Sequence, residues 1–157
     1  VAPTDWDLSG QDPQPYWSDT TDVEVSTGTQ LGYGFQNTTA MVAQDSTADA
    51  PFDSSNTAGR AALMARAYSN SGKTDWFLPS LAELNELCKY ARRQPTGDSS
   101  VDCNSAGSLR TGFAQFSPYF SSSEESATRA WNQYFSSGQR LETSKASRSR
   151  IRPVRAG

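Results

Sequence analysis

The sharpest change in the hydrophobic pattern of this chain falls at residues 76–88, where a short apolar run gives way to helical spacing. Residues 76–78, Trp-Phe-Leu, predict a buried strand that Pro79 ends. Ser80 and Glu83 then match a capping box, in which each side chain satisfies a free amide of the first helical turn. The apolar stripe of the helix that follows consists of Leu81, Leu84, Leu87 and Cys88. We therefore predict a strand end, a cap and an amphipathic helix here, and expect this joint to organise the fold.

Two more helices are predicted upstream of that joint. The first spans about residues 36–44, with Asn37 or Thr38 as its cap. The second spans about residues 57–68 and follows Asn56, whose side chain is suited to cap it. The shared face of this second helix consists of Ala61, Met64, Ala65 and Tyr68. Small alanines on that face allow close packing against a sheet, so we expect both helices to support the core.

Residues 1–31 are predicted to be irregular because prolines interrupt them, although Val23 and Val25 alternate with polar neighbours as in a brief strand. One stretch matches the first positions of a calcium-binding loop: Asp5, Asp7, Ser9 and Gly10. The bidentate acid that such a loop needs later falls at Tyr16, which has no carboxylate. We interpret the stretch as a solvated acidic turn and expect no cofactor, with calcium as the one ion left open.

Aromatic residues mark the predicted strands of the C-terminal part. Residues 119–120 and 130–135 are aromatic-rich and bounded by serine or glycine turns. A hairpin loop at 136–138 leads to a returning strand at 139–143. Residues 151–154 form a last strand, and Pro153 implies that this strand is an edge or lacks a ladder donor there. The longest strand is predicted to carry Trp131, Gln133 and Phe135 on one face and Asn132 and Tyr134 on the other. These elements predict an α+β fold, with two or three helices around a small twisted antiparallel sheet and with long loops.

The chain contains only two cysteines, Cys88 on the third predicted helix and Cys103 in the polar loop after it. In an exported protein, a single pair of cysteines favours a disulfide. The bond would close a loop and stabilise the fold by about 3 kcal/mol in the chain-entropy model. Two thiols without any histidine fall short of a tetrahedral zinc site.

Length and composition fit one domain that spans residues 1–157. The sequence has 35% hydrophobic residues, a mean hydropathy of −0.67 and no apolar stretch that approaches the ~20 residues of a membrane span. No signal-peptide pattern is present, and the first residue is Val1. We therefore expect a processed product or a piece of a longer protein, without insertion into a membrane.

Charge is divided unevenly between the two ends of the chain. Residues 1–59 carry nine acidic residues and no Lys or Arg, whereas residues 119–157 carry seven Lys and Arg against three Glu. The net charge of −3 argues against a general nucleic-acid binder. A basic C-terminal face would attract anionic ligands such as sulfated glycans, although solvated surface charges and structural arginines explain the same residues.

The sequence lacks the residues of the common catalytic sites. It contains no histidine, which excludes Ser-His-Asp and Cys-His arrangements. Glu124 and Glu125 are adjacent and would point to opposite faces of a strand, so they cannot flank one glycosidic bond. No glycine motif for phosphate binding occurs. These absences favour a binding protein over an enzyme.

Several motifs, in order along nearly the whole chain, resemble one bacterial family: Ala2-Pro3-Thr4-Asp5-Trp6, Gly32–Thr38, Trp76–Ser80 with Glu83-Leu84-Asn85, Phe120–Glu124, Ala130-Trp131 and Ile151–Arg155. The family is typified by the C-terminal domain of the Legionella collagen-like adhesin. The resemblance implies a C-type-lectin-like fold that binds a ligand without catalysis. Because the family usually has more sequence before Ala2-Pro3, it also favours the C-terminal part of a longer exported protein, found outside the cell, on a cell surface or on a virion. It also links the chain, by analogy, to the variable proteins of diversity-generating retroelements.

In the family that the chain resembles, the segment after the Ser-Ser-Ser-Glu motif forms an exposed ligand face. The resemblance implies that core and turn positions are Trp131, Phe135, Gly138, Lys145 and Ile151–Arg155. The positions implied to contact the ligand are Thr128, Arg129, Asn132, Tyr134, Arg140, Leu141, Glu142, Thr143, Ser147 and Arg148, with Lys145 counted as a candidate contact as well. Tyr and Arg concentrate binding energy, and Asn and Ser supply adaptable polar contacts.

Three functions are consistent with this pattern. The first is an adhesion or receptor-binding module of a bacterial surface or phage fibre, which binds a glycan or a protein. The second is a structural module of a fibre or filament, in which the same face packs on neighbouring copies as a homo-oligomer. The third is an enzyme of the formylglycine-generating type, but its active cysteine pair does not match Cys88 on a helix and Cys103 in a loop. We favour the first.

Overall fold

A computed structural model describes residues 1–4, 6, 11–18, 23–45 and 60–157. Within these residues the helices are α1 (Gly34–Gln44), α2 (Ala61–Ala67) and α3 (Leu81–Ala91), and the strands are β1 (Tyr119–Glu124), β2 (Arg129–Gln133) and β3 (Arg140–Ser144). The strands form an antiparallel sheet in the order β1-β2-β3. The predicted α+β class is confirmed, and the C-type-lectin-like topology stays a prediction.

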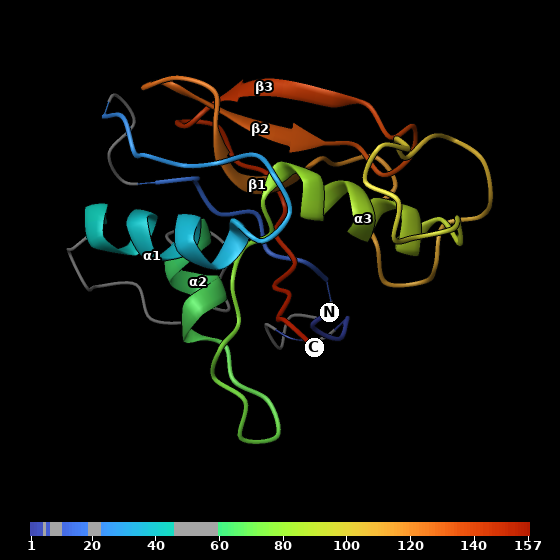
Figure 1. Cartoon of the computed structure of the whole chain (residues 1–157), viewed down its shortest axis with the longest axis horizontal. Helices are drawn as coiled ribbons and strands as arrows, with labels where there is room; N and C mark the ends of the chain where they lie inside the picture. Colours follow the sequence, from blue (N-terminus) through green and yellow to red (C-terminus); the bar gives the residue numbers. More distant parts are fainter. Residues whose placement is uncertain (5, 7–10, 19–22, 46–59) are drawn as a thin grey trace.

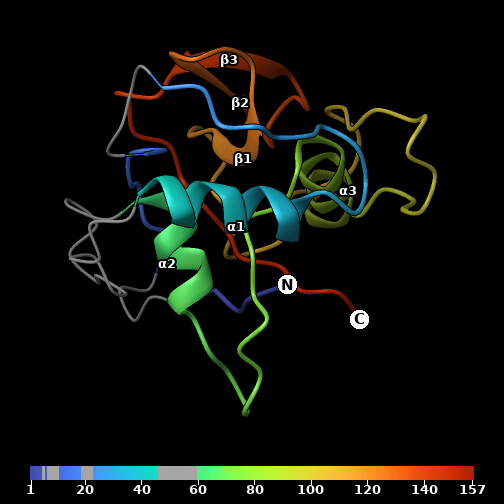
Figure 2. The ribbon, with the colours of Figure 1, turned by 60° about the vertical axis from the view of Figure 1, so that its left-hand side comes forward.

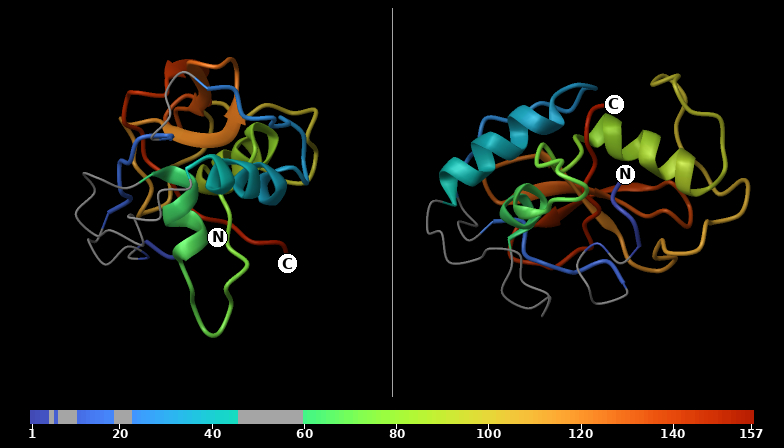
Figure 3. Two further views of the ribbon diagram at one scale, coloured as in Figure 1. Left: turned by 90° about the vertical axis from the view of Figure 1, so that its left-hand side faces the viewer. Right: turned by 90° about the horizontal axis from the view of Figure 1, so that it is seen from below.

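The sheet lies above the helices in Figure 1, with α1 and α2 under one end and α3 under the other. α1 packs against α2 and β1, whereas α3 packs against β1 and β2. Figure 3 shows the same separation of α1 from α3 when the molecule is seen from below. The two chain ends lie close together (Figure 2), and the amide of Ala2 donates to the carbonyl of Pro153 at 2.9 Å.

β1 is buried on both faces and divides the core into two clusters. Successive side chains of a strand point to opposite sides. Phe120 packs with Trp17 and Met41 in the cluster beside α1 and α2. Tyr119 packs with Phe135 in the cluster beside α3, and their stacked rings lie 4.3 Å apart between centroids. β1 therefore lies between the two clusters, in contact with α1 and with α3.

The three consecutive serines of β1 are fully buried, although serine is a residue typical of surfaces. Ser121 donates to the carbonyl of Trp131, and Ser123 donates to the carbonyl of Gly28. The hydroxyl of Ser122 accepts from the side-chain amide of Asn37. A buried hydroxyl is tolerated only when it is hydrogen-bonded, so this run connects the sheet to the segments around it.

The capping box at the start of α3 is present as predicted. The amide of Glu83 donates to the Ser80 hydroxyl, and the amide of Ser80 donates to the Glu83 carboxylate at 2.7 Å. The predicted strand before it was wrong. Phe77 alone forms a bridge, to Val154, because the next amide, that of Leu78, donates to the hydroxyl of Thr38 instead of to a strand. The predicted final strand is reduced to this same bridge.

The predicted caps of the first helix were wrong. α1 begins at Gly34, two residues earlier than predicted, and no side chain caps it. Asn37 and Thr38 lie inside the helix, and their side chains bind backbone groups other than the free amides of the first helical turn. Asn37 exchanges hydrogen bonds with the backbone of Gly28, and Thr38 donates to the carbonyl of Gly34.

The second helix, α2, begins at Ala61, later than predicted. The residues that share its buried face are Ala61, Met64, Ala65 and Tyr68, as predicted. Asn56, its predicted cap, lies outside the described residues. Val23 and Val25 form no strand, and the amide of Val25 donates to the Glu124 carboxylate.

A buried ion pair joins the two ends of the chain. Arg152 donates from Nε and Nη2 to the two carboxylate oxygens of Asp12, at 2.6 and 2.8 Å. The same carboxylate accepts from Trp6 at 2.9 Å and from Tyr119 at 2.5 Å. Burial raises the pKa of Asp12 above its ordinary value, and the hydrogen bond from Arg152 opposes that shift. Part of the C-terminal positive charge is therefore structural and does not reach the surface.

Candidate ligand-binding face

The hairpin of β2 and β3 presents one face whose outer part is open to solvent. Directly opposed residues of an antiparallel pair share a face. The register pairs Trp131 with Glu142 and Gln133 with Arg140, and Arg129 lies on the same side by alternation. We call Arg129, Trp131, Arg140 and Glu142 the hairpin face. Its side chains are exposed or half-buried, whereas Gln133 at its inner end is buried.

Ion pairs hold the charged side chains of the hairpin face. Arg129 donates from Nη2 to the carbonyl of Glu142 at 3.0 Å, and its Nε lies 3.8 Å from the Glu142 carboxylate. Arg140 contacts Asp102 at 2.6 Å between Nη2 and Oδ1. Asp102 is highly exposed and Arg140 is partly exposed. Exposed pairs contribute only about 0–1 kcal/mol, so a ligand anion can displace Asp102 from Arg140 at little cost.

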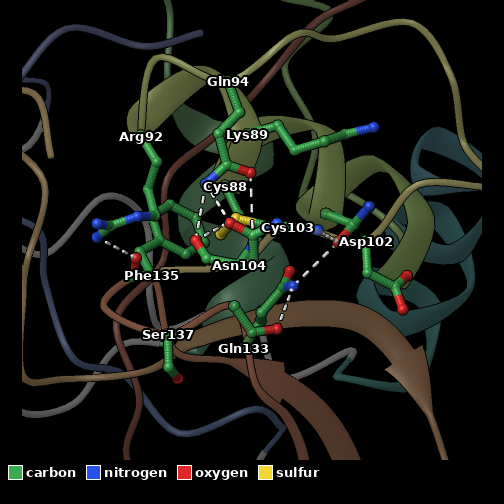
Figure 4. The surroundings of a disulfide bond; sticks show 12 residues. Cys88, Lys89, Arg92, Gln94, Asp102, Cys103, Asn104, Gln133, Phe135 and Ser137 are labelled. Atoms are coloured by element: carbon green, nitrogen blue, oxygen red, sulfur yellow. Dashed lines mark hydrogen bonds between the residues drawn. A yellow bond between two sulfur atoms is a disulfide. The ribbon is translucent and has the colours of Figure 1, made fainter. Parts of the chain in front are cut away.

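The loop that carries Asp102 is fixed by the predicted disulfide, which is confirmed (Figure 4). Both cysteines, Cys88 and Cys103, are buried. Arg92, at the end of α3, donates to the carbonyl of Phe135 and to the carbonyls of residues 105–107 in the same loop. The partner of Arg140 is therefore held on a rigid support.

Asn85 of α3 ties the disulfide loop to the sheet. Its Oδ1 accepts from the amide of Cys103 at 2.9 Å and from Nε2 of Gln133 at 3.1 Å. Its Nδ2 donates to the carbonyl of Val101. One buried amide thus fixes the inner end of β2 relative to the loop that faces Arg140.

A polar cavity of about 500 Å³ lies beside Arg140. Its walls come from four separate segments: Thr29, Gln30, Leu31, Leu81, Ala82, Ser99 and Arg140. The amide of Ala82 is already used, because it donates to the carbonyl of Thr29. Hydroxyl and amide side chains with one guanidinium and an apolar wall suit a polar ligand such as a sugar. Arg140 is the residue that links this cavity to the hairpin face.

Two of the predicted contacts were wrong because their side chains are buried. Asn132 is 3% exposed, and the ladder pairs it with Phe120 on the side of the α1–α2 cluster. Lys145 is fully buried. Both faces of β2 are covered along much of its length, so alternation did not separate an inner face from an outer one. Lys145 instead agrees with its predicted position in the core.

Trp131 differs from its prediction in the opposite sense, since it is more exposed than expected. Its predicted place was in the core, but it is only partly buried on the hairpin face. Gln133 lies on the same side of β2 as predicted, but it is buried against Asn85 of α3, and Phe135 is buried in the cluster beside α3. A half-exposed indole beside Arg140 and Glu142 adds an aromatic surface to the polar groups of the site.

The remaining predicted contacts lie around the hairpin without forming one surface. Leu141 and Thr143 point to the side opposite the hairpin face, and both keep some exposure. Tyr134 is half-buried in the β2–β3 turn. Arg148 places its guanidinium 4.8 Å from the centre of the exposed Tyr16 ring. Thr128 and Ser147 are exposed near the other end of the hairpin.

Sequence reasoning missed most of the cavity beside Arg140. Its other walls come from residues 29–31, from the first turn of α3 and from Ser99, far from β3 in sequence. The long polar loop around Ser99 was the one available signal, because loops on a rigid scaffold often carry binding residues. Among the described residues, no group of three or more acidic or cysteine side chains is placed to hold a metal ion. The calcium-loop match at residues 5–10 lies almost entirely outside that set.

Comparison with known protein families identifies the chain. The sequence profile of the Lcl C-terminal domain matches residues 37–155, which is most of the chain. A comparison with curated individual proteins found no match to the chain. None of the described helices has the length and apolar character needed to cross a bilayer.

Proposed function

The chain belongs to the family of Lcl C-terminal domains, and on this premise we propose that it is a non-enzymatic adhesion module that recognises a glycan or a protein receptor. The family points to display at a surface, and we propose a bacterial surface or a phage fibre. The observation that carries the proposal is the exposed hairpin face, which continues into the polar cavity at Arg140 and is supported by α3 and the disulfide loop.

The chemistry of this site favours a glycan with an anionic group, such as a sulfated sugar. Arg140 supplies a guanidinium whose only ion pair within the described residues is with exposed Asp102. Thr29, Gln30 and Ser99 supply hydroxyl and amide groups. Trp131 supplies a partly exposed ring of the kind on which sugar faces stack. A protein receptor would use the same arginine and aromatic groups as anchors.

The state of the cysteines supports binding over catalysis. Enzymes of the formylglycine-generating type need a reactive thiol, and both cysteines of this chain are joined in one buried disulfide. Quantitative reaction of the native protein with a thiol reagent would contradict this assignment.

A glycan and protein array, probed with and without calcium, tests the proposal. We expect a ligand whose binding falls at least tenfold in Arg140→Ala and falls to a smaller extent in Tyr134→Ala. Lys73→Ala is the matched control, because Lys73 is an exposed cation on a separate hairpin. Unchanged binding of a confirmed ligand by Arg140→Ala would place the site elsewhere. Loss of binding on removal of calcium would mean that the ligand site includes a calcium ion.

A role in fibre assembly is the second candidate, and the position of β3 favours it. β3 is an edge of the described sheet, so its outer backbone groups are available to another strand. Light scattering over a range of protein concentrations separates the two functions. A monomer at all concentrations would exclude assembly through this edge.

A further inference from the structure

Tyr90 and Val1 line two further cavities beside α3, and the first of these shares one wall residue, Leu31, with the cavity at Arg140. One is an apolar groove of about 520 Å³, and the other is a cleft of about 410 Å³. Tyr90 lines both and is 43% exposed. An exposed aromatic wall shared by two cavities allows one ligand to occupy both.

The groove exposes more apolar surface than scattered single residues would. Leu31 is 47% exposed and Phe35 is 46% exposed, and both line it together with Phe77, Leu87 and Val154. Adjacent exposed apolar side chains of this kind mark binding surfaces. The groove is therefore suited to an alkyl or aryl group.

The carboxylates at the edge of the groove are all engaged within the protein. Asp75 pairs with Arg155, and Glu83 accepts the amides of Gly32 and Ser80. Glu86 pairs with Lys89 and accepts the amide of Gly97. Because these three carboxylates are already paired or hydrogen-bonded, they disfavour a bound apolar ligand less than three free carboxylates would.

The cleft on the other side of Tyr90 is cationic. It is lined by Arg93, Arg110 and Arg152, and no acidic residue that the structure describes lines it. Arg152 is neutralised by Asp12. Within the described part of the chain, neither Arg93 nor Arg110 has a carboxylate partner, and Arg93 makes no side-chain hydrogen bond. Arg110 lies with its guanidinium 4.5 Å from the centre of the Tyr90 ring.

The backbone at Arg93 gives an independent reason to connect this residue with a ligand. The amide of Gln94 donates to the carbonyl of Lys89, and that of Arg93 donates to the carbonyl of Tyr90, which is the bonding of a Schellman motif. Arg93 occupies its left-handed position, with φ of 60°. Glycine is the usual residue there because a side chain strains that conformation. An arginine held in this conformation, with no partner for its charge among the residues that the structure describes, indicates a role outside stability.

We propose that the groove and the cleft form one binding site for a free, single-chain anionic amphiphile. The alkyl chain lies in the groove against Leu31 and Phe35. A phosphate or carboxylate head lies in the cleft, between the guanidinium groups of Arg93 and Arg110.

Isothermal titration calorimetry with octyl, decyl and dodecyl phosphate, each below its critical micelle concentration, tests the site. We expect the affinity to rise about three- to fourfold for each added methylene that enters the groove. Octyl glucoside, which has a neutral head, and inorganic phosphate, which has no chain, should each bind at least tenfold more weakly than octyl phosphate. An affinity independent of chain length would overturn the proposal.

Arg93→Gly is the decisive variant, because glycine suits the left-handed position. We expect an unchanged or higher melting temperature together with at least tenfold weaker binding of decyl phosphate. Lys73→Ala removes one exposed positive charge elsewhere and should leave the affinity unchanged. Equal weakening of decyl phosphate binding by both variants would mean that net charge alone explains the loss, and it would overturn the proposal. Binding to phosphatidylglycerol vesicles without binding of the monomeric phosphates would also overturn the proposal.

Discussion

The ammonium group of Lys145 lies 4.6 Å from the centre of the Trp17 ring, in a fully buried position. The same group donates to the Glu124 carboxylate at 2.7 Å and to the carbonyl of Val23 at 3.0 Å. The end of β3, the end of β1 and the N-terminal segment therefore meet at one buried cation. The hairpin face depends on this anchor for its orientation, although Lys145 itself cannot reach a ligand.

Lys145→Met should lower the free energy of unfolding by about 3–5 kcal/mol, because it leaves the buried carboxylate of Glu124 without its cation. Urea denaturation measures the change. Glu124→Gln in the same background removes the unpaired charge, so the double variant should recover part of the loss. A single-variant loss below about 1 kcal/mol would mean that the pair is hydrated in solution.

Replacement of both cysteines by alanine should lower the free energy of unfolding by about 3 kcal/mol, in line with a loop closed across 15 residues. Reduction of the wild-type protein should produce the same loss, measured by urea denaturation with and without dithiothreitol. The hydrogen bonds of Arg92 and Asn85 remain, so the native far-ultraviolet circular dichroism should persist below the transition. An unchanged midpoint would show that the bond does not constrain the unfolded chain.

Gly138→Ala should be much more damaging than Gly72→Ala. Both glycines have positive φ, 78° and 75°, so each variant has a strain cost of about 1–2 kcal/mol. A Cβ at Gly138 would lie 2.0 Å from the carbonyl oxygen of Cys103, whereas a Cβ at Gly72 meets nothing within 4 Å. We expect an additional cost of about 1–3 kcal/mol at Gly138 from the collision. Equal midpoints for the two variants in urea denaturation would contradict this close approach.

The carboxyl group of Asp75 should titrate below the ordinary pKa of an aspartate. The hydrogen bonds from Arg155, at 2.8 and 2.9 Å, lower the pKa of Asp75. A lowered pKa in the folded state contributes stability above the ordinary value of 3.8, and the contribution is lost as the pH falls through the folded value. Nuclear magnetic resonance titration of the Asp75 carboxyl carbon measures it directly. In Arg155→Gln the midpoint should return toward 3.8.

Local patterns predicted some elements well because neighbours in the sequence decide them. The capping box of Ser80 and Glu83 and the apolar stripe behind it depend only on residues within one helix. The hairpin of β2 and β3 followed from alternating aromatic and polar residues around a glycine turn. The disulfide followed from a count of two cysteines.

Predictions failed where a side chain found a partner far away in the chain. Asn37 and Thr38 have the chemistry of helix caps, but Gly28 and Leu78 occupy their hydrogen-bonding groups. Asn132 was predicted to contact a ligand but is buried, and the burial of Lys145 agrees with its predicted core position and contradicts its alternative role as a contact. The binding of a polar group by distant backbone leaves no periodic signal in a single sequence.

The sequence by itself determined the helix that starts at Ser80, the β2–β3 hairpin and the motifs that resemble the family, because short-range spacing and composition specify them. Only the tertiary structure decided which polar residues of the hairpin are exposed, which segments enclose the cavity at Arg140, and that Tyr90 lines both an apolar groove and a cationic cleft. The reason is physical: burial and charge compensation depend on atoms brought together from separate segments, and their pairing is set by the packing of the whole chain.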